Sequence, residues 1–85
     1  MPMLDDERNT VNVEFDVIVG DNIRRLRLKR GLSQASLAER ANIDVTRLSR
    51  VENGQRRLSF REAMAICDTL HVRPTRLASA SQAHS

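Results

Sequence analysis

The stretch that decides the fold spans residues 33–54 and reads SQASLAERANIDVTRLSRVENG. Ser33 predicts the N-cap of a helix, because a serine hydroxyl accepts a hydrogen bond from a free amide of the first helical turn. Asn42 tolerates the left-handed conformation that commonly ends a helix, and Asp44 has a side chain that caps the next one. The stretch therefore predicts two short helices joined by a tight turn, over residues 34–41 and 45–53.

Small and apolar residues determine how these two helices meet. Ala38 is small enough for a close crossing at the turn, and Leu48 and Val51 lie on one helix face because they are three positions apart. With that face buried, the second helix turns a polar face outward. Two helices joined in this way form a helix-turn-helix, which places its second helix in the DNA major groove. The residues expected on the outward face are Val45, Thr46, Arg47, Ser49, Arg50 and Asn53.

Helices are also predicted on both sides of this motif. A first helix is expected from about residue 20 to residue 30, with Gly31 as its stop signal. Ser59 and Glu62 have the spacing of a capping box, which starts a fourth helix. Pro74 suits the first turn of a short last helix. The apolar stripe of the fourth helix, expected to lie in the core, comprises Phe60, Ala63, Met64, Ile66, Cys67 and Leu70.

Residues 10–17 follow a different pattern, in which apolar and polar side chains alternate strictly. This period is typical of a half-buried strand, but a single strand needs a mate to be stable. Two alternatives follow: the segment pairs with its copy across a dimer axis, or it extends the first helix towards the N-terminus. The expected organisation is an acidic arm over 1–19, a helix-turn-helix domain over 20–78 and a flexible tail over 79–85.

Charge is distributed unevenly along the 85 residues of the chain. Residues 1–21 carry a net charge of −5, whereas residues 22–85 carry +8, and Lys29 is the only lysine. Arginine presents a planar fork of donors that suits phosphates and guanine edges. The basic part of the chain therefore points to a polyanionic partner.

The composition argues against several classes of protein. No pattern of nucleophile and base, phosphate-binding loop or metal-ligand spacing is present, so we expect neither an enzyme nor a cofactor or metal site. A chain this short leaves little room for a deep pocket, and no small-molecule ligand is expected. No apolar run reaches the length of a membrane span. The single cysteine, Cys67, has no partner for an internal disulfide, which favours the reducing cytoplasm.

Several separate blocks of the sequence together resemble one family. They are IRRLR at 23–27, GLSQ at 31–34, LA at 37–38, LSRVENG at 48–54 and the close from His71 to Leu77. At this spacing they are similar to the Cro/phage-repressor (Xre-type) helix-turn-helix regulators, over the range Ile23–Leu77. The resemblance implies an all-α fold, a five-helix lambda-repressor-like DNA-binding domain. The residues before Ile23 lie outside the family pattern and inherit nothing from it.

The resemblance also implies roles for individual residues. It implies base contacts from the second helix of the motif, at Val45, Thr46, Arg47, Ser49 and Arg50. It implies contacts to DNA phosphates at Ser33, Gln34, Asn53, Arg56 and Arg57. It matches Arg27 and Glu52 to a structural, partly buried ion pair. Because Asn42 replaces a common glycine and the recognition helix does not open on the family's glutamine, the operator sequence is not carried over.

The function implied is that of a sequence-specific transcriptional regulator without enzymatic activity. The simplest form is a homodimeric repressor on a palindromic operator, with its two recognition helices about 34 Å apart. Its partners are then double-stranded DNA and a second copy of the chain. Three alternatives stay open: a restriction–modification controller protein, an antitoxin whose acidic arm binds a basic toxin, and a plasmid or phage maintenance repressor. The dimer interface is expected either in the arm or in the last helix; the candidate residues are Val11, Val13, Phe15, Val17 and Leu77.

Overall fold

The computed structural model describes the backbone of residues 2–79 and the side chains of residues 13–79. This part of the chain is all-helical, with five helices and no strand, which confirms the expected fold class. The helices are α1 Pro2–Lys29, α2 Gln34–Ala41, α3 Val45–Glu52, α4 Phe60–Leu70 and α5 Pro74–Ala78. The predicted tail lies outside the described residues, apart from Ser79.

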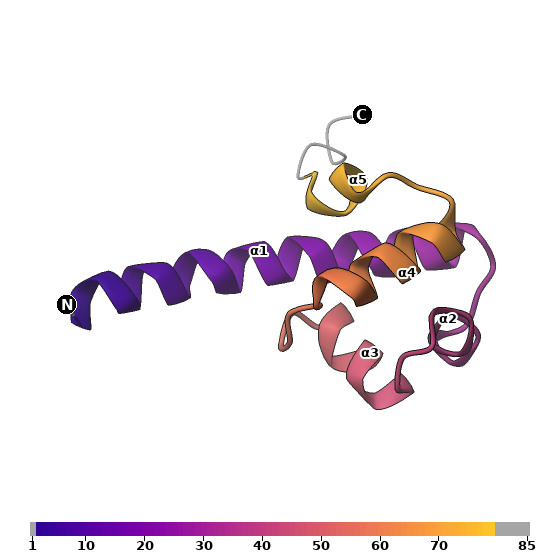
Figure 1. Ribbon diagram of the computed structural model, residues 1–85, viewed down its shortest axis with the longest axis horizontal. Helices are drawn as coiled ribbons and strands as arrows, with labels where there is room; N and C mark the ends of the chain where they lie inside the picture. Colours follow the sequence, from indigo (N-terminus) through magenta and orange to yellow (C-terminus); the bar gives the residue numbers. More distant parts are fainter. Residues whose placement is uncertain (1, 80–85) are drawn as a thin grey trace.

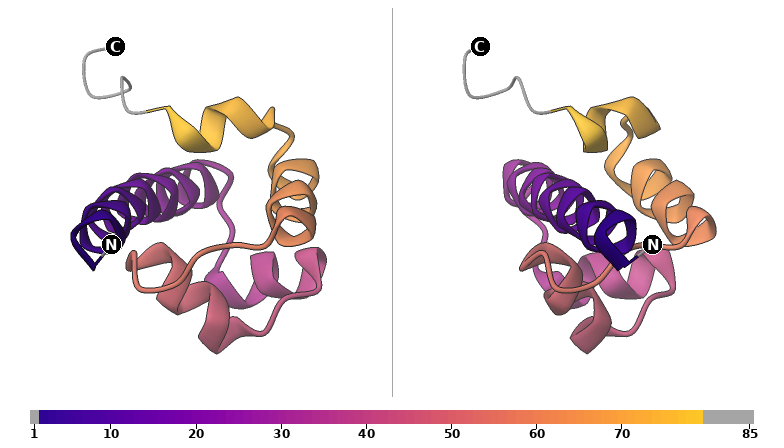
Figure 2. Two further views of the ribbon diagram at one scale, coloured as in Figure 1. Left: turned by 60° about the vertical axis from the view of Figure 1, so that its left-hand side comes forward. Right: turned by 90° about the vertical axis from the view of Figure 1, so that its left-hand side faces the viewer.

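The long helix α1 is the frame on which the other helices are arranged. It runs along the longest axis of the molecule, and the other helices gather around its C-terminal half (Figure 1). Two further views show α5 on one side of α1 and the pair α2–α3 on the other (Figure 2). The helix-turn-helix and the last helix therefore occupy opposite sides of the molecule.

Residues 10–17, for which the sequence leaves a strand and a helix open, are part of α1. The extended alternative is thus wrong, and a strand paired across a dimer axis is not formed. Helical spacing explains the outcome: Phe15, Val19 and Ile23 recur every four positions, so they lie on the side of α1 that faces the other helices. Val19 and Ile23 pack in the core at the C-terminal end of this row.

The bounds of the short helices follow from local hydrogen bonds that the sequence predicts. The side chains of Ser33 and Asp44 each accept a hydrogen bond from the backbone amide three positions further on, at 3.0 and 3.2 Å. Asn42 has the left-handed conformation, with a φ of 57°. Ser59 and Glu62 exchange both hydrogen bonds of a capping box, at 3.1 and 2.9 Å. Each helix of the motif is therefore started and stopped by its own residues.

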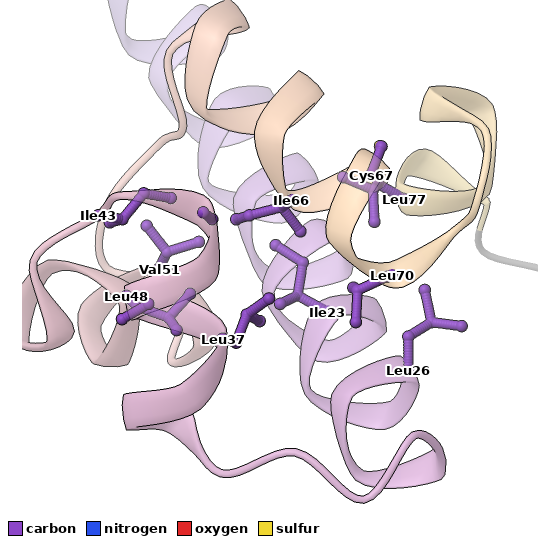
Figure 3. Close-up of a cluster of buried hydrophobic side chains, with 12 residues drawn as sticks. Ile23, Leu26, Leu37, Ile43, Leu48, Val51, Ile66, Cys67, Leu70 and Leu77 are labelled. Atoms are coloured by element: carbon purple, nitrogen blue, oxygen red, sulfur yellow. The ribbon is translucent and has the colours of Figure 1, made fainter.

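A single aliphatic core joins the helices, and no tryptophan or tyrosine contributes because the chain has neither. Its side chains come from all five helices and point toward one another (Figure 3). Cys67 is one of them, and burial raises the pKa of its thiol above the ordinary value. The fully buried aliphatic residues are Ile23, Leu37, Leu48, Val51, Ile66 and Leu70.

Two residues expected in the core are on the surface instead. Phe60 is 81% exposed and Met64 is 40% exposed, so their assignment to the buried stripe of α4 is wrong. The positions 63, 66, 67 and 70 already form the i, i+3, i+4, i+7 row that faces the core. Met64 lies about 100° around the helix from position 63, and Phe60 occupies the first turn, where the row begins.

Two contacts of α1 fix its neighbours on opposite sides. At Gly20 the helix approaches α3 so closely that an added Cβ would lie 2.1 Å from the backbone oxygen of Val51. Asn22 is buried, and its Nδ2 donates hydrogen bonds to the carbonyl oxygens of Leu77 and Ser79, at 2.7 and 2.8 Å. The first contact sets the position of the recognition helix, and the second ties the end of α5 to α1.

Candidate DNA-binding interface

The two helices of the motif bury one side and expose the other. On the inner side α2 contributes Leu37, Ala38 and Ala41, all buried, and α3 contributes Leu48 and Val51. Ile43, in the turn, is also buried. Because this packing fixes the rotation of α3 about its axis, it also decides which side chains of α3 reach outward.

Most of the side chains expected to contact bases lie together on the outer face of α3. Val45 is 44% exposed, and Thr46 and Arg50 are exposed as well. Ser49 is half-buried beside them, and Asn53, expected to contact a phosphate, is exposed just after the helix. This face combines a methyl-bearing edge with hydroxyl and guanidinium donors, the groups that read base edges in a major groove.

Arg47, also expected to contact a base, is held by contacts within the protein. Its Nε and Nη2 donate hydrogen bonds to the two carboxylate oxygens of Glu62, both at 2.7 Å. Nη2 also donates to the backbone oxygen of Arg57, at 3.0 Å. This guanidinium therefore connects α3 to the start of α4 and to the loop between them. The sequence shows Glu62 only as a capping residue, so this pairing across fifteen positions escapes prediction.

The loop between α3 and α4 carries the two arginines expected on DNA phosphates. Arg56 and Arg57 are both exposed. Arg57 Nε also donates a hydrogen bond to Asp16 Oδ1 of α1, at 3.2 Å. Half of the Arg57 side chain stays exposed, so the guanidinium keeps donors on its open side. An acidic residue of the N-terminal arm thus holds one arginine of the basic surface.

A buried polar cluster lies where α1, α2 and α3 meet. Arg27 and Glu52, expected as an ion pair, are joined by two hydrogen bonds of 2.7 and 3.0 Å, and only 9% and 1% of their side chains are exposed. Arg27 also donates to the backbone oxygen of Leu32, at 2.9 Å. Gln34 Nε2 donates to Glu52 Oε1, at 2.9 Å. The cluster ties the end of α1, the start of α2 and the end of α3 to one another.

The pair of Arg47 and Glu62 makes stability depend on pH. The hydrogen bond that Glu62 accepts from the Arg47 guanidinium is the main reason that the pKa of Glu62 falls from 4.5 to about 2. The hydrogen bond from the Ser59 backbone amide lowers this pKa further, whereas burial of the carboxylate opposes the fall. A carboxylate whose pKa is lower in the folded state stabilises the fold above its unfolded pKa. That contribution is lost as the pH falls through the folded pKa. The loss therefore occurs between about pH 4.5 and about pH 2.

We expect Glu62→Gln to lower the free energy of unfolding by about 1 kcal/mol at pH 7, because a charge-assisted hydrogen bond is lost at a partly exposed site. The difference from wild type should shrink as the pH is lowered across that window. Urea unfolding at a series of pH values measures this difference in the free energy of unfolding. Glu39→Gln, at an exposed glutamate of α2, is the matched control and should track wild type throughout. A gap between wild type and Glu62→Gln that stays constant down to pH 2 would contradict this assignment.

No described helix is both long enough and apolar enough to cross a membrane. Among the described residues, no group of three or more histidine, cysteine, aspartate or glutamate side chains is placed to hold a metal ion.

The fold and the exposed polar face of α3 together define a helix-turn-helix DNA-binding domain of the transcription-regulator type. Residues 23–77 match the model of the HTH_3 family, described as helix-turn-helix, and the chain belongs to this family. No curated protein matches the chain.

Three solved structures illustrate the similarity. The restriction-modification controller protein C.AhdI from Aeromonas hydrophila has 34% identity and a TM-score of 0.70, over 73% of this chain and 94% of its own. The clp gene regulator ClgR from Corynebacterium glutamicum has 22% identity and a TM-score of 0.71, over 74% of this chain and 67% of its own. An HTH_3 family transcriptional regulator from Vibrio cholerae has 21% identity and a TM-score of 0.73, over 78% of this chain and 37% of its own. The last two show the fold alone. The family match and the controller protein C.AhdI agree with the expectation of a DNA-binding regulator rather than an enzyme.

Proposed function

We propose that this protein is a sequence-specific, homodimeric transcriptional repressor that acts in the cytoplasm on a palindromic operator. The observation that carries the proposal is the outer face of α3, which exposes Val45, Thr46 and Arg50 while the opposite face of the helix is fully buried. A short helix held this firmly suits insertion into a major groove. A second copy, related by a two-fold axis, then reads the second half-site.

Base readout is assigned to the outer face of α3 alone. The Val45 side chain and the Thr46 methyl group suit contact with a thymine methyl, and Arg50 suits the O6 and N7 atoms of a guanine. Ser49 adds a hydroxyl that serves either kind of base. Arg47 is assigned a positioning role, because its Nε and Nη2 donate to Glu62 and to the loop.

Phosphate contacts are assigned to the start of α2 and to the loop after α3. The first turn of α2 presents free backbone amides, the arrangement that favours an anion at a helix N-terminus. Gln34 stands at that turn, and its amide nitrogen has a second hydrogen beyond the one given to Glu52. Ser33 lies beside it. Asn53, Arg56 and Arg57 would hold the backbone on the other side of the groove, with Arg57 exchanging Asp16 for a phosphate.

Arginine substitutions separate these two kinds of contact. We expect Arg50→Ala to relax the preference at one base pair of each half-site by about 1–3 kcal/mol, whereas Arg56→Ala lowers affinity for every sequence alike. Arg56→Ala should also reduce the slope of log affinity against log salt by about one per subunit. Arg73→Ala is the matched control, because Arg73 precedes α5 on the side of α1 away from α3 (Figure 2).

The operator itself comes from selecting bound duplexes out of a random DNA pool at near-physiological salt. An enriched inverted repeat is the expected result, and wild type and the three variants are then compared on that repeat by fluorescence anisotropy. Weak binding that depends only on salt, without enrichment, would count against sequence-specific regulation. That outcome would favour an antitoxin, a protein whose partner is another protein.

A restriction–modification controller is the second candidate, and one observation favours it. C.AhdI, a controller protein, is 34% identical and is covered over 94% of its length by this chain. A reporter gene placed downstream of the selected repeat distinguishes a repressor from a controller protein. Expression that only falls as the protein accumulates supports the repressor, whereas a rise at low protein levels supports a controller that activates.

A further inference from the structure

Asp16 and Val17, in the middle of α1, both contact the loop between α3 and α4. Only 15% of the Asp16 side chain is exposed, and its Oδ1 accepts a hydrogen bond from Arg57 Nε at 3.2 Å. Both residues of α1 lie before residues 23–77, the range that matches the family. The family match therefore does not account for this contact between an acidic residue and the basic surface.

The loop is fixed against α1 beside this ion pair. At Gly54, near the start of the loop, an added Cβ would lie 2.8 Å from Val17 Cγ2 and 3.1 Å from Val17 Cα. At the other end of the loop, Leu58 packs against the hydrophobic core. Because both ends are held, the backbone of the loop keeps Arg57 within reach of Asp16. The two groups separate only when the Arg57 side chain turns away.

The two ion pairs next to the recognition helix differ in strength. Arg47 and Glu62 share two hydrogen bonds of 2.7 Å, the short length typical of charge-assisted bonds. Arg57 donates one longer bond to Asp16, and half of its side chain is exposed. The first pair is suited to fixing a side chain in place. The second pair is weak enough for a DNA phosphate to replace the carboxylate.

We propose that Asp16 is a built-in competitor of DNA, a carboxylate that occupies a phosphate-binding arginine in the free protein. This inference rests on the proposed function, in which Arg57 binds a phosphate. A phosphate that takes Arg57 leaves a mostly buried carboxylate without its partner and brings a second negative charge close to it. Both changes oppose binding. Asp16 therefore lowers the affinity for every DNA sequence alike, because Arg57 is assigned to the DNA backbone and not to a base.

Asp16→Asn tests the competition, since it keeps the size of the side chain and removes its charge. We expect the affinity for DNA to rise about three- to fivefold for each bound subunit, the upper end of what a partly exposed ion pair contributes. The slope of log affinity against log salt should also steepen by up to about one per subunit, because the abandoned carboxylate of wild type takes up a cation. Fluorescence anisotropy measures both quantities, on the selected operator and on an unrelated duplex of equal length.

Glu14→Gln is the matched control, because it removes the same charge two positions away in α1. Glu14 is exposed and has no hydrogen bond or ion pair among the described residues. Its effect on affinity should stay below about twofold, since it acts only through a field that salt screens. Thermal melting verifies that each variant is folded at the assay temperature.

A second control repeats Asp16→Asn in an Arg57→Ala background. Competition requires the guanidinium, so in this background Asp16→Asn should raise the affinity no more than Glu14→Gln does in wild type. The alanine keeps the backbone oxygen of residue 57 that accepts a hydrogen bond from Arg47.

The possible outcomes separate this inference from the function on which it rests. An affinity that is unchanged or lower in Asp16→Asn would overturn the inference, and a lower one would mean that the carboxylate orients Arg57 for DNA. A gain that persists without the guanidinium would overturn it too, because loss of charge alone would then explain the effect. Wild type that binds neither duplex would instead refute the proposed function, and the inference with it.

Discussion

Gly20→Ala is expected to lower the free energy of unfolding by about 3 kcal/mol or more. In an ordinary helix interior this change is stabilising by up to about 1 kcal/mol, because alanine is the better helix former. Here the added Cβ would meet the backbone oxygens of Val51 and Glu52 at 2.1 and 2.8 Å. Backbone atoms in a close-packed interior do not yield cheaply, and overpacking of this kind costs about 1–3 kcal/mol or more. The two helices would have to move apart, and α3 is the helix to which we assign base readout.

Thermal and urea unfolding measure this effect. A loss of 3 kcal/mol corresponds to a fall in Tm of roughly 12–24 °C for a domain of this size. Gly31→Ala is the control: it has a φ of +71° but no neighbour within 4 Å of an added Cβ. Its cost should be about 1–2 kcal/mol, the price of a left-handed non-glycine residue. If Gly20→Ala proved as stable as wild type, α1 and α3 would not approach each other as closely as described.

Glu52→Ala is expected to cost about 3–5 kcal/mol, because it leaves the Arg27 guanidinium buried without its carboxylate. Arg27 is 8% exposed and has two hydrogen bonds to Glu52, so water cannot easily replace the lost partner. Gln34 loses its acceptor in the same variant. The loss should therefore loosen the start of α2 as well as the end of α3.

A double variant distinguishes an unpaired charge from simple loss of packing. Arg27→Met combined with Glu52→Leu removes both charges at similar volume, and it should recover most of the stability that Glu52→Ala loses. Asp21→Asn is the exposed counterpart: Asp21 pairs with Arg25 at 2.9 Å, but 33% and 58% of the two side chains are exposed. Its cost should stay below about 1 kcal/mol. These free energies of unfolding are measured with urea in low salt. Equal losses for Asp21→Asn and Glu52→Ala would refute the argument.

The local structure of the motif could be predicted because it is determined by neighbouring residues. Ser33, Asn42 and Asp44 each act within three or four positions of themselves, and each has the predicted conformation or hydrogen bond. The capping box of α4 is of the same kind. The pair of Arg27 and Glu52 was reached differently, through the resemblance to a family, because twenty-five positions separate the two residues.

The failures concern properties that depend on the whole fold. Alternation at residues 10–17 has the period of a strand, but no strand partner exists in the described chain, and the segment continues α1. Phe60 and Met64 look like core residues because they are apolar, yet the packing of α4 turns them outward. The ion pair of Arg47 and Glu62 is not anticipated, because the two residues lie on different helices. None of these outcomes has a signal within one turn of the residue concerned.

The attachment of α5 by Asn22 has a consequence for how the domain opens. This helix has only five residues, one buried side chain and no side-chain hydrogen bond at its N-cap. Apart from Leu77, the amide of Asn22 is its principal anchor to α1. We therefore expect the helix to unfold as a separate local unit, with amide hydrogens that exchange with solvent at a lower free energy than those of α1 to α4. Opening this unit would expose Leu77, the core residue of α5, while the helix-turn-helix stayed folded.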